Sequence, residues 1–159
     1  MSVAVRALQA ADVPRLLELI DGLADYEKLP RPDADARQRL AEDAIAQPSR
    51  FSTLLADVDG QVVGYALYFF TYSSFRARLS LYLEDIFVLP QTRGQGAGLA
   101  LFKACAREAV ARGCARMEWQ VLAWNEPSIN FYRRLGARQL ETWLPFRLED
   151  AQLVAVADQ

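Results

Sequence analysis

The chain of 159 residues contains no histidine. This absence excludes the Ser-His-Asp and Cys-His systems of nucleophilic catalysis, and it removes the ligand that most zinc sites use. Any proton transfer must therefore be carried out by carboxylates, tyrosine, lysine, cysteine or water. We expect no metal site.

Cysteine is also scarce, with only Cys105 and Cys114. Two cysteines form neither a disulfide framework nor a cluster of metal ligands, so we interpret them as reduced thiols of a cytoplasmic protein. Basic charge is not in excess either, because 18 Lys and Arg stand against 20 Asp and Glu, for a net charge of −2. Without a concentrated basic surface, we expect no nucleic-acid partner.

Long apolar runs are missing as well. The most apolar stretch, "VVGYALYFF" at Val62–Phe70, is far shorter than the roughly 20 residues of a membrane span, so it predicts a strand buried on both faces. The N-terminus shows no basic region followed by an apolar core. We therefore expect neither a secretory signal nor a membrane partner.

What is present is a globular composition, 52% hydrophobic and 24% charged, which predicts one domain over residues 1–159. Asp59-Gly60 separates two apolar runs and predicts a hairpin, because these residues tolerate positive φ. Periodicity and turn residues predict strands at 3–8, 51–58, 61–72, 79–89, 116–122 and 142–149, and helices at 12–26, 33–45, 97–112 and 127–135 with a short helical tail. This order predicts an α/β fold with an antiparallel first half.

The segment "QTRGQGAGLALF", residues 91–102, places Gly94, Gly96 and Gly98 where an apolar strand passes into a helix. Its spacing matches neither the G-x-G-x-x-G of dinucleotide-binding folds nor the Gly-Lys-Ser/Thr of phosphate loops. The glycines nevertheless free successive N–H groups to point at one anion at the start of a helix, and Arg93 adds a positive charge. The alternative is a tight turn whose glycines serve packing.

The context of this turn resembles the acyl-coenzyme A signature of the GNAT superfamily of N-acetyltransferases, here Gln91-x-x-Gly94-x-Gly96. The stretches "DYE", "YFFTY", "LYLEDIFV", "RGQGAG" and above all "WNEPSINFYRRLGA" are similar to its spermidine/spermine-type diamine acetyltransferases, in register from about Val3 to Leu148. The resemblance implies a single-domain fold with a mixed, mostly antiparallel seven-stranded sheet, flanked by helices and splayed after Val88 at the cofactor site.

The resemblance also implies acetyl-CoA as cofactor, coenzyme A as product and a homodimeric assembly. The pyrophosphate would lie on residues 93–98, and the Val88 N–H would donate to the thioester carbonyl. The positions implied to bind the cofactor are Phe87, Val88, Arg93, Gly94, Gln95, Gly96, Ala97, Gly98, Asn125, Ser128, Asn130 and Tyr132. For Asn125, the cap of a helix is an equal interpretation.

Acetyl transfer to an amine needs an acceptor for the proton of the ammonium and an acid for the departing thiolate. Tyr132 matches the family's general acid; for the residue alone, a core aromatic beside Phe131 is the alternative. Glu84 matches the residue that takes the amine's proton through an ordered water, and we expect its burial to raise its pKa. No histidine is available to activate Cys105, so direct attack is favoured over an acetyl-cysteine route.

Asp85 matches a residue that binds the cationic substrate. Glu84 and Asp85 are consecutive in an apolar strand, so we expect them to face opposite sides. Either carboxylate could instead pair with an arginine such as Arg76 or Arg78.

The amine site is implied to include Tyr26 and Glu27, although on sequence alone these are an ordinary solvated helix end. Phe75 and Phe146 stand where the family often has tryptophan, and Ser73 replaces an acidic residue. Losing one carboxylate favours a short diamine or a lysine-like amine such as thialysine over a long polyamine.

These observations favour an enzyme that acetylates a small cationic amine by direct attack. A non-catalytic acyl-CoA-binding regulatory module is the alternative from another class. A GNAT enzyme for another amine, such as a protein N-terminus or an antibiotic, is a third hypothesis.

Overall fold

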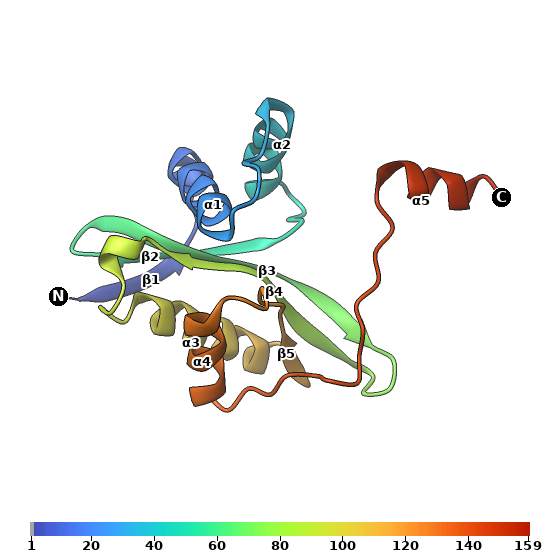
Figure 1. Ribbon diagram of the computed structural model, residues 1–159. Coiled ribbons are helices and arrows are strands. Elements are labelled where there is room, and N and C mark those ends of the chain that lie inside the picture. Colours follow the sequence, from blue (N-terminus) through green and yellow to red (C-terminus); the bar gives the residue numbers. More distant parts are fainter. Residues whose placement is uncertain (1) are drawn as a thin grey trace. The chain divides into compact units, whose positions relative to one another are not determined.

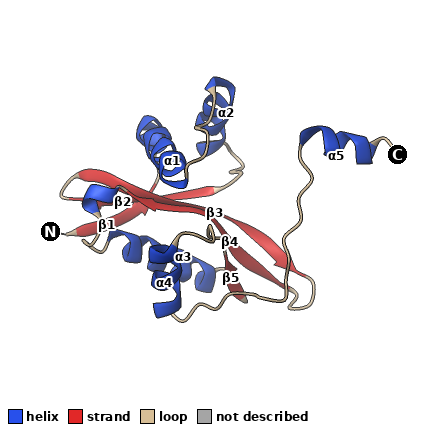
Figure 2. Ribbon diagram, in the orientation of Figure 1, coloured by secondary structure: helices blue, strands red, loops and turns tan. Residues whose placement is uncertain are grey.

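The computed structural model describes residues 2–159, which form two compact units, one up to Gln120 and one from Val121 to Gln159. The first unit contains one sheet with the strands β1 Val3–Ala7, β2 Ser52–Val58, β3 Gln61–Ser73, β4 Arg78–Val88 and β5 Arg116–Glu118. The strands lie in the order β1-β2-β3-β4-β5. The α/β class is thus confirmed (Figures 1 and 2).

The sheet is mixed, because β1 to β4 pair antiparallel and β5 pairs parallel to β4. The expectation of seven strands in a mostly antiparallel sheet is corrected to a five-stranded mixed sheet within residues 2–159. The strand expected at 142–149 does not form. Pro145 lies in its middle, and a proline there removes a ladder hydrogen bond.

The β2–β3 hairpin turns at Asp59 and Gly60, whose φ values of 51° and 84° are both positive, as predicted. The Gly60 N–H donates to the Asp57 carboxylate at 2.8 Å, which closes the turn. The expected burial of β3 on both faces is also confirmed, because every residue from Val63 to Tyr68 is buried.

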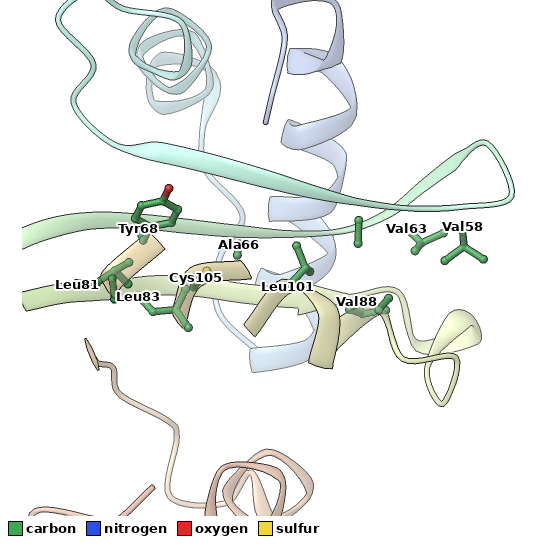
Figure 3. Packing of buried hydrophobic residues seen from close by; sticks show 12 residues of the cluster. Val58, Val63, Ala66, Tyr68, Leu81, Leu83, Val88, Leu101 and Cys105 are labelled. Carbon is green, nitrogen blue, oxygen red and sulfur yellow. The ribbon is translucent and has the colours of Figure 1, made fainter. Parts of the chain in front are cut away.

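Helices cover both faces of this sheet. Figure 1 shows α1 (Val13–Glu27) and α2 (Ala34–Ala44) on one face and α3 (Ala97–Ala111) on the other. On the α1 face the core contains Leu16, Leu19, Tyr65, Leu67 and Phe87. On the α3 face Tyr68, Leu81 and Leu83 pack with Leu101 and Cys105 (Figure 3). Successive residues of β3 therefore alternate between two separate cores.

Short 3-10 turns precede two of these helices, at Ala10–Asp12 and Pro90–Thr92. The bidentate pair of Arg6 with Asp12, at 2.7 and 2.9 Å, fixes the first turn to β1. None of the helices between residues 2 and 159 is long and apolar enough to cross a membrane.

The second unit contains α4 (Glu126–Arg134) and α5 (Asp150–Ala157), which confirms the expected helical tail. Asn125 caps α4, because its side chain accepts from the Ser128 N–H at 3.4 Å. After α4, Gly136 has a φ of 89°. The N–H groups of Gly136 and Ala137 bond back to the carbonyls of Arg133 and Tyr132, which is the Schellman arrangement that ends a helix.

Candidate active site

A β-bulge in β4 sets the direction of its two acidic side chains. Leu67 of β3 is paired with Asp85, whereas Tyr68 is paired with Leu83, so Glu84 is an extra residue without a partner. Bulges redirect a side chain and are frequent beside active sites. Glu84 is exposed, so the expectation of a buried Glu84 was wrong: the bulge turns it to solvent instead of into the core.

Asp85 is the carboxylate that the fold buries in part. The Tyr65 hydroxyl donates to its Oδ2 at 3.0 Å. Burial, assisted by the charges of Glu84 and Glu27 and opposed by the Tyr65 hydrogen bond, raises the pKa of Asp85 to about 6. The burial and raised pKa that were expected for Glu84 are therefore found at Asp85.

Neither carboxylate is neutralised by an arginine. Throughout residues 2–159, Glu84 and Asp85 form no ion pair with Arg76, Arg78 or any other basic side chain. The alternative of a structural ion pair is therefore not found. Glu27, the last residue of α1, acts electrostatically on Asp85, and burial raises its own pKa. We call Glu27, Glu84 and Asp85 the acidic cluster.

Tyr26 lies next to this cluster in sequence, but its ring interacts with a cation of the protein. The guanidinium of Arg93 lies 4.4 Å from the ring centroid. Arg93 Nε also donates to the Val88 carbonyl at 3.1 Å. Arg93 thus joins the end of α1 to the end of β4, and its charge is directed there, whereas the sequence predicted it beside a pyrophosphate.

The glycine turn requires glycine at two positions. Gly94 and Gly96 have φ values of 81° and 87°, and Gly96 is the cap of α3. A Cβ built on either would meet no atom within 4 Å, so close packing does not explain them. At Gly98 a Cβ would lie 3.8 Å from Val88, an ordinary contact. The backbone amides at the N-terminus of α3 are thus not covered by side chains from Gly94 and Gly96.

An unpaired strand edge lies beside the N-terminus of α3. Pairing of β5 with β4 ends at Tyr82–Glu118, so Leu83–Val88 have no strand partner on that side within residues 2–120. The separation expected after Val88 therefore begins earlier, since β5 has only three residues. The Leu89 N–H bonds to Val63 of β3. By the alternation of antiparallel strands, the N–H and C=O of Val88 point to the unpaired edge.

These features fit acetyl-CoA chemically. The free N–H groups at a helix N-terminus can bind a diphosphate. An unpaired strand edge can form hydrogen bonds with an extended arm that carries amides. The predicted positions Phe87 to Gly98 are brought together here, with Phe87 buried and Ala97 buried at the first helical position.

The remaining predicted cofactor residues belong to the second unit. Asn125 is buried and acts as the helix cap, so the alternative given for it is observed. Ser128 and Tyr132 are half-buried and Asn130 is exposed, all on α4. The Tyr132 ring stands edge-on to Phe131 with centroids 5.4 Å apart. Its backbone carbonyl is fixed by the Schellman bonds described above.

The two phenylalanines predicted to line the amine site are exposed. Phe75, in the β3–β4 turn, is 97% exposed, and Phe146, in the segment before α5, is 93% exposed. Ser73 is buried, and its Oγ accepts from the Arg76 N–H at 3.2 Å, so it stabilises the turn. Phe75 and Phe146 are thus exposed to solvent in this structure, and Ser73 supplies no charge to the acidic cluster.

Two further findings bear on the chemistry. Cys105 is fully buried in the α3-side core, and burial raises the pKa of its thiol to about 12. Such a thiol is a poor nucleophile. No group of three or more histidine, cysteine, aspartate or glutamate residues that could hold a metal ion occurs in residues 2–159.

Tyr65 is the site residue that sequence reasoning missed. It stands in a run of apolar residues, a pattern that predicts only a buried strand. Its proximity to Asp85 depends on the register between β3 and β4, which the pattern of either strand alone does not contain.

Comparison with known proteins agrees with this geometry. Residues 16–137 match the Acetyltransferase (GNAT) family. The thialysine N-epsilon-acetyltransferase of Mus musculus is 36% identical over 159 residues, covering 93% of each chain, and that of Sus scrofa is 37% identical with the same coverage. An integron cassette protein from V. cholerae has the same fold, with a TM-score of 0.85, 24% identity and coverage of 100% of this chain and 99% of its own.

The family match and these relatives confirm the expectation of an N-acetyltransferase of the acyltransferase class. The chain belongs to the GNAT family of acetyltransferases.

Proposed function

We propose that this protein transfers the acetyl group of acetyl-CoA to the primary amine of a small cationic substrate by direct attack. The observation that carries the proposal is the acidic cluster, of which Glu84 and Asp85 lie on β4, the strand that also provides the unpaired edge. A cation is attracted to carboxylates that have no basic partner. The unpaired edge of β4 and the adjacent N-terminus of α3 offer hydrogen-bonding groups to the cofactor.

The cofactor would be held by the backbone of residues 93–98, by the Val88 N–H and by Asn125, Ser128 and Asn130 of the second unit. When bound, acetyl-CoA supplies an acetyl thioester. The N–H of Val88, directed to the unpaired edge, would donate to the thioester oxygen as negative charge develops there. A single acetyltransferase domain over residues 1–159 is part of this proposal.

Proton transfer is assigned to Glu84 and Tyr132. The Glu84 carboxylate is exposed on the bulge, where water can relay the proton of the amine to it. A phenol carries a proton at neutral pH, so the Tyr132 hydroxyl would serve as the acid for the departing thiolate. The deeply buried thiol of Cys105 supports direct attack rather than an acetyl-cysteine route.

Substrate binding is assigned to Asp85 and Glu27, which would hold ammonium groups, with Tyr26, Phe75 and Phe146 as aromatic neighbours. The similarity to thialysine N-epsilon-acetyltransferases supports a lysine-like amine. The use of Ser73 in a turn, in place of an acidic side chain, supports the same preference over long polyamines.

A homodimer is also proposed. Tyr72, Phe75 and Trp143 are 66%, 97% and 73% exposed, and large exposed aromatics are typical of interfaces. Light scattering of the purified protein tests this assembly: a mass of one chain would reject it. A cytoplasmic location stays a prediction from the reduced thiols.

An amine panel tests the proposed function. Acetyl-CoA is mixed with thialysine, lysine, ornithine, putrescine, spermidine and a neutral amine, and the release of free thiol is followed. We expect turnover of the lysine-like amines with higher kcat/KM than spermidine. Thermal stabilisation by coenzyme A without thiol release from any amine would favour the regulatory module instead.

A further inference from the structure

Tyr65 connects two strands below the acidic cluster. It is fully buried in β3, and its hydroxyl donates to Asp85 Oδ2 of β4 at 3.0 Å. In the register of the sheet Tyr65 is paired with Phe87, so Asp85 lies diagonally across from it. Phe87 packs in the same core as α1, which places the Tyr65–Asp85 bond on the α1 face.

The second oxygen of Asp85 has a different environment. Oδ1 forms no hydrogen bond within residues 2–159. It is also not among the sealed side-chain atoms without a partner, which in that range are Asp21 Oδ1 and Thr53 Oγ1. One carboxylate oxygen is therefore held by the protein, whereas the other has no hydrogen bond and is not sealed.

The groups that act on this carboxylate come from three elements. Glu27 approaches from α1, Glu84 is its neighbour on β4, and Tyr65 faces it from β3. The two glutamates disfavour the ionised form of Asp85, and burial does so more strongly. Of the side chains that act on Asp85, Tyr65 alone stabilises its negative charge.

We propose that Tyr65 is a positioning residue of the amine site: its hydroxyl orients the Asp85 carboxylate and keeps it ionised, so that Oδ1 can accept the ammonium of the substrate. This inference rests on the proposed function, because it assigns the Asp85 carboxylate to amine binding. Tyr65 does not touch the reacting atoms and acts only through Asp85.

The variant Tyr65→Phe isolates this role, since it keeps the ring and removes the donor. Losing a hydrogen bond to a charged group should raise the pKa of Asp85 by roughly one unit from its value of about 6. The ionised fraction, and with it kcat/KM for the amine, should then fall about fivefold at pH 6 and about twofold at pH 7, with little change above pH 8. The loss should appear in KM, with kcat nearly constant.

Tyr68→Phe is the matched control. Tyr68 is also a buried tyrosine of β3, but it packs in the α3-side core, on the opposite face from Asp85. It should leave the pH profile of kcat/KM unchanged. A profile that shifts equally in both variants would show a general effect of removing a buried hydroxyl and would overturn the proposal.

A second measurement does not depend on activity. The carboxyl carbon of Asp85, labelled with ¹³C and assigned by its loss in Asp85→Asn, is titrated by NMR in wild type and in Tyr65→Phe. We expect a midpoint near pH 6 in wild type and a higher midpoint in the variant. A wild-type midpoint near pH 4, or no shift in a folded variant, would overturn the proposal.

The two experiments separate the inference from the function on which it rests. If the wild-type protein releases no thiol with any amine, the proposed acetyltransferase fails, and with it the assignment of Asp85 to amine binding. If wild type is active but Tyr65→Phe has the wild-type pH profile and KM, only the role of Tyr65 fails. If Tyr65→Phe does not fold, the wild-type titration still decides whether Asp85 is a carboxylate that needs such a donor.

Discussion

Arg93 lies with its guanidinium 4.4 Å from the ring centroid of Tyr26, while its Nε donates to the carbonyl of Val88 at 3.1 Å. One side chain thereby connects the end of α1, the end of β4 and the glycine turn that begins with Gly94. In the proposed function the amine site and the cofactor site adjoin at this residue.

This relationship predicts energetic coupling between Arg93 and Tyr26. Arg93→Ala and Tyr26→Leu should each destabilise the protein by about 1 kcal/mol. Both lose the cation–π contact, and Arg93→Ala also loses the hydrogen bond to Val88. The double variant should lose less than the sum, by about 0.5–1 kcal/mol. Urea unfolding of the four proteins measures this cycle. Strict additivity would mean that the contact contributes nothing.

Gly96 and Gly98 should respond differently to alanine. Gly96 has a φ of 87°, so Gly96→Ala should lower the free energy of unfolding by about 1–2 kcal/mol. Gly98 is in the first turn of α3 and a Cβ there would lie 3.8 Å from Val88, so Gly98→Ala should be close to neutral in stability. Chemical denaturation of both variants tests the turn; equal stability would contradict the left-handed geometry at Gly96.

Asp85 should make stability depend on pH. Its pKa is raised to about 6 from 3.8, so the native state binds more protons than the unfolded state between these values. Stability from this group therefore falls as pH rises from about 4 to about 6. Asp85→Asn removes the ionisation and should stabilise the protein by about 1–3 kcal/mol at pH 7 and little at pH 3.5.

Denaturation at the two pH values measures this difference. Glu141→Gln, at an exposed position of the second unit, provides a control that should change stability at neither pH. An Asp85→Asn protein less stable than wild type at pH 7 would show that the carboxylate is better accommodated than its burial indicates.

Much of the arrangement was predictable from sequence, and the failures have physical causes. Asp59-Gly60 specified its hairpin locally, and the apolar run around Val63–Tyr68 specified a strand buried on both faces. The bulge at Glu84 was not predictable, because it depends on how β3 and β4 align. With this extra residue in β4, Glu84 is exposed and Asp85 is the partly buried carboxylate whose pKa is raised.

The C-terminal part shows a second kind of failure. The segment 142–149 was expected to be a strand, yet it forms none. A strand requires a partner edge as well as a pattern, and Pro145 limits the hydrogen bonds that the segment can offer. The roles of Tyr132, Asn125, Ser128 and Asn130 came from family resemblance and stay predictions.

Cys105 should be dispensable for catalysis. Its thiol is fully buried and its pKa is raised to about 12, so it is not a nucleophile at neutral pH. Cys105→Ala should keep kcat within about twofold, while the small cavity lowers stability by about 1 kcal/mol. Steady-state kinetics and urea unfolding measure both effects. Loss of turnover in a folded Cys105→Ala protein would indicate an acetyl-cysteine route.

Detection of the acetylated product is the sharpest test of acetyl transfer to a small amine. Wild-type protein, Glu84→Gln and Tyr132→Phe are each incubated with acetyl-CoA and thialysine at pH 8, and the amine is analysed by mass spectrometry. We predict N-acetylthialysine from wild type, with kcat reduced at least about tenfold in each variant. The absence of acetylated amine from wild type would contradict the proposed acetyl transfer, and equal rates in all three proteins would contradict the roles of Glu84 and Tyr132.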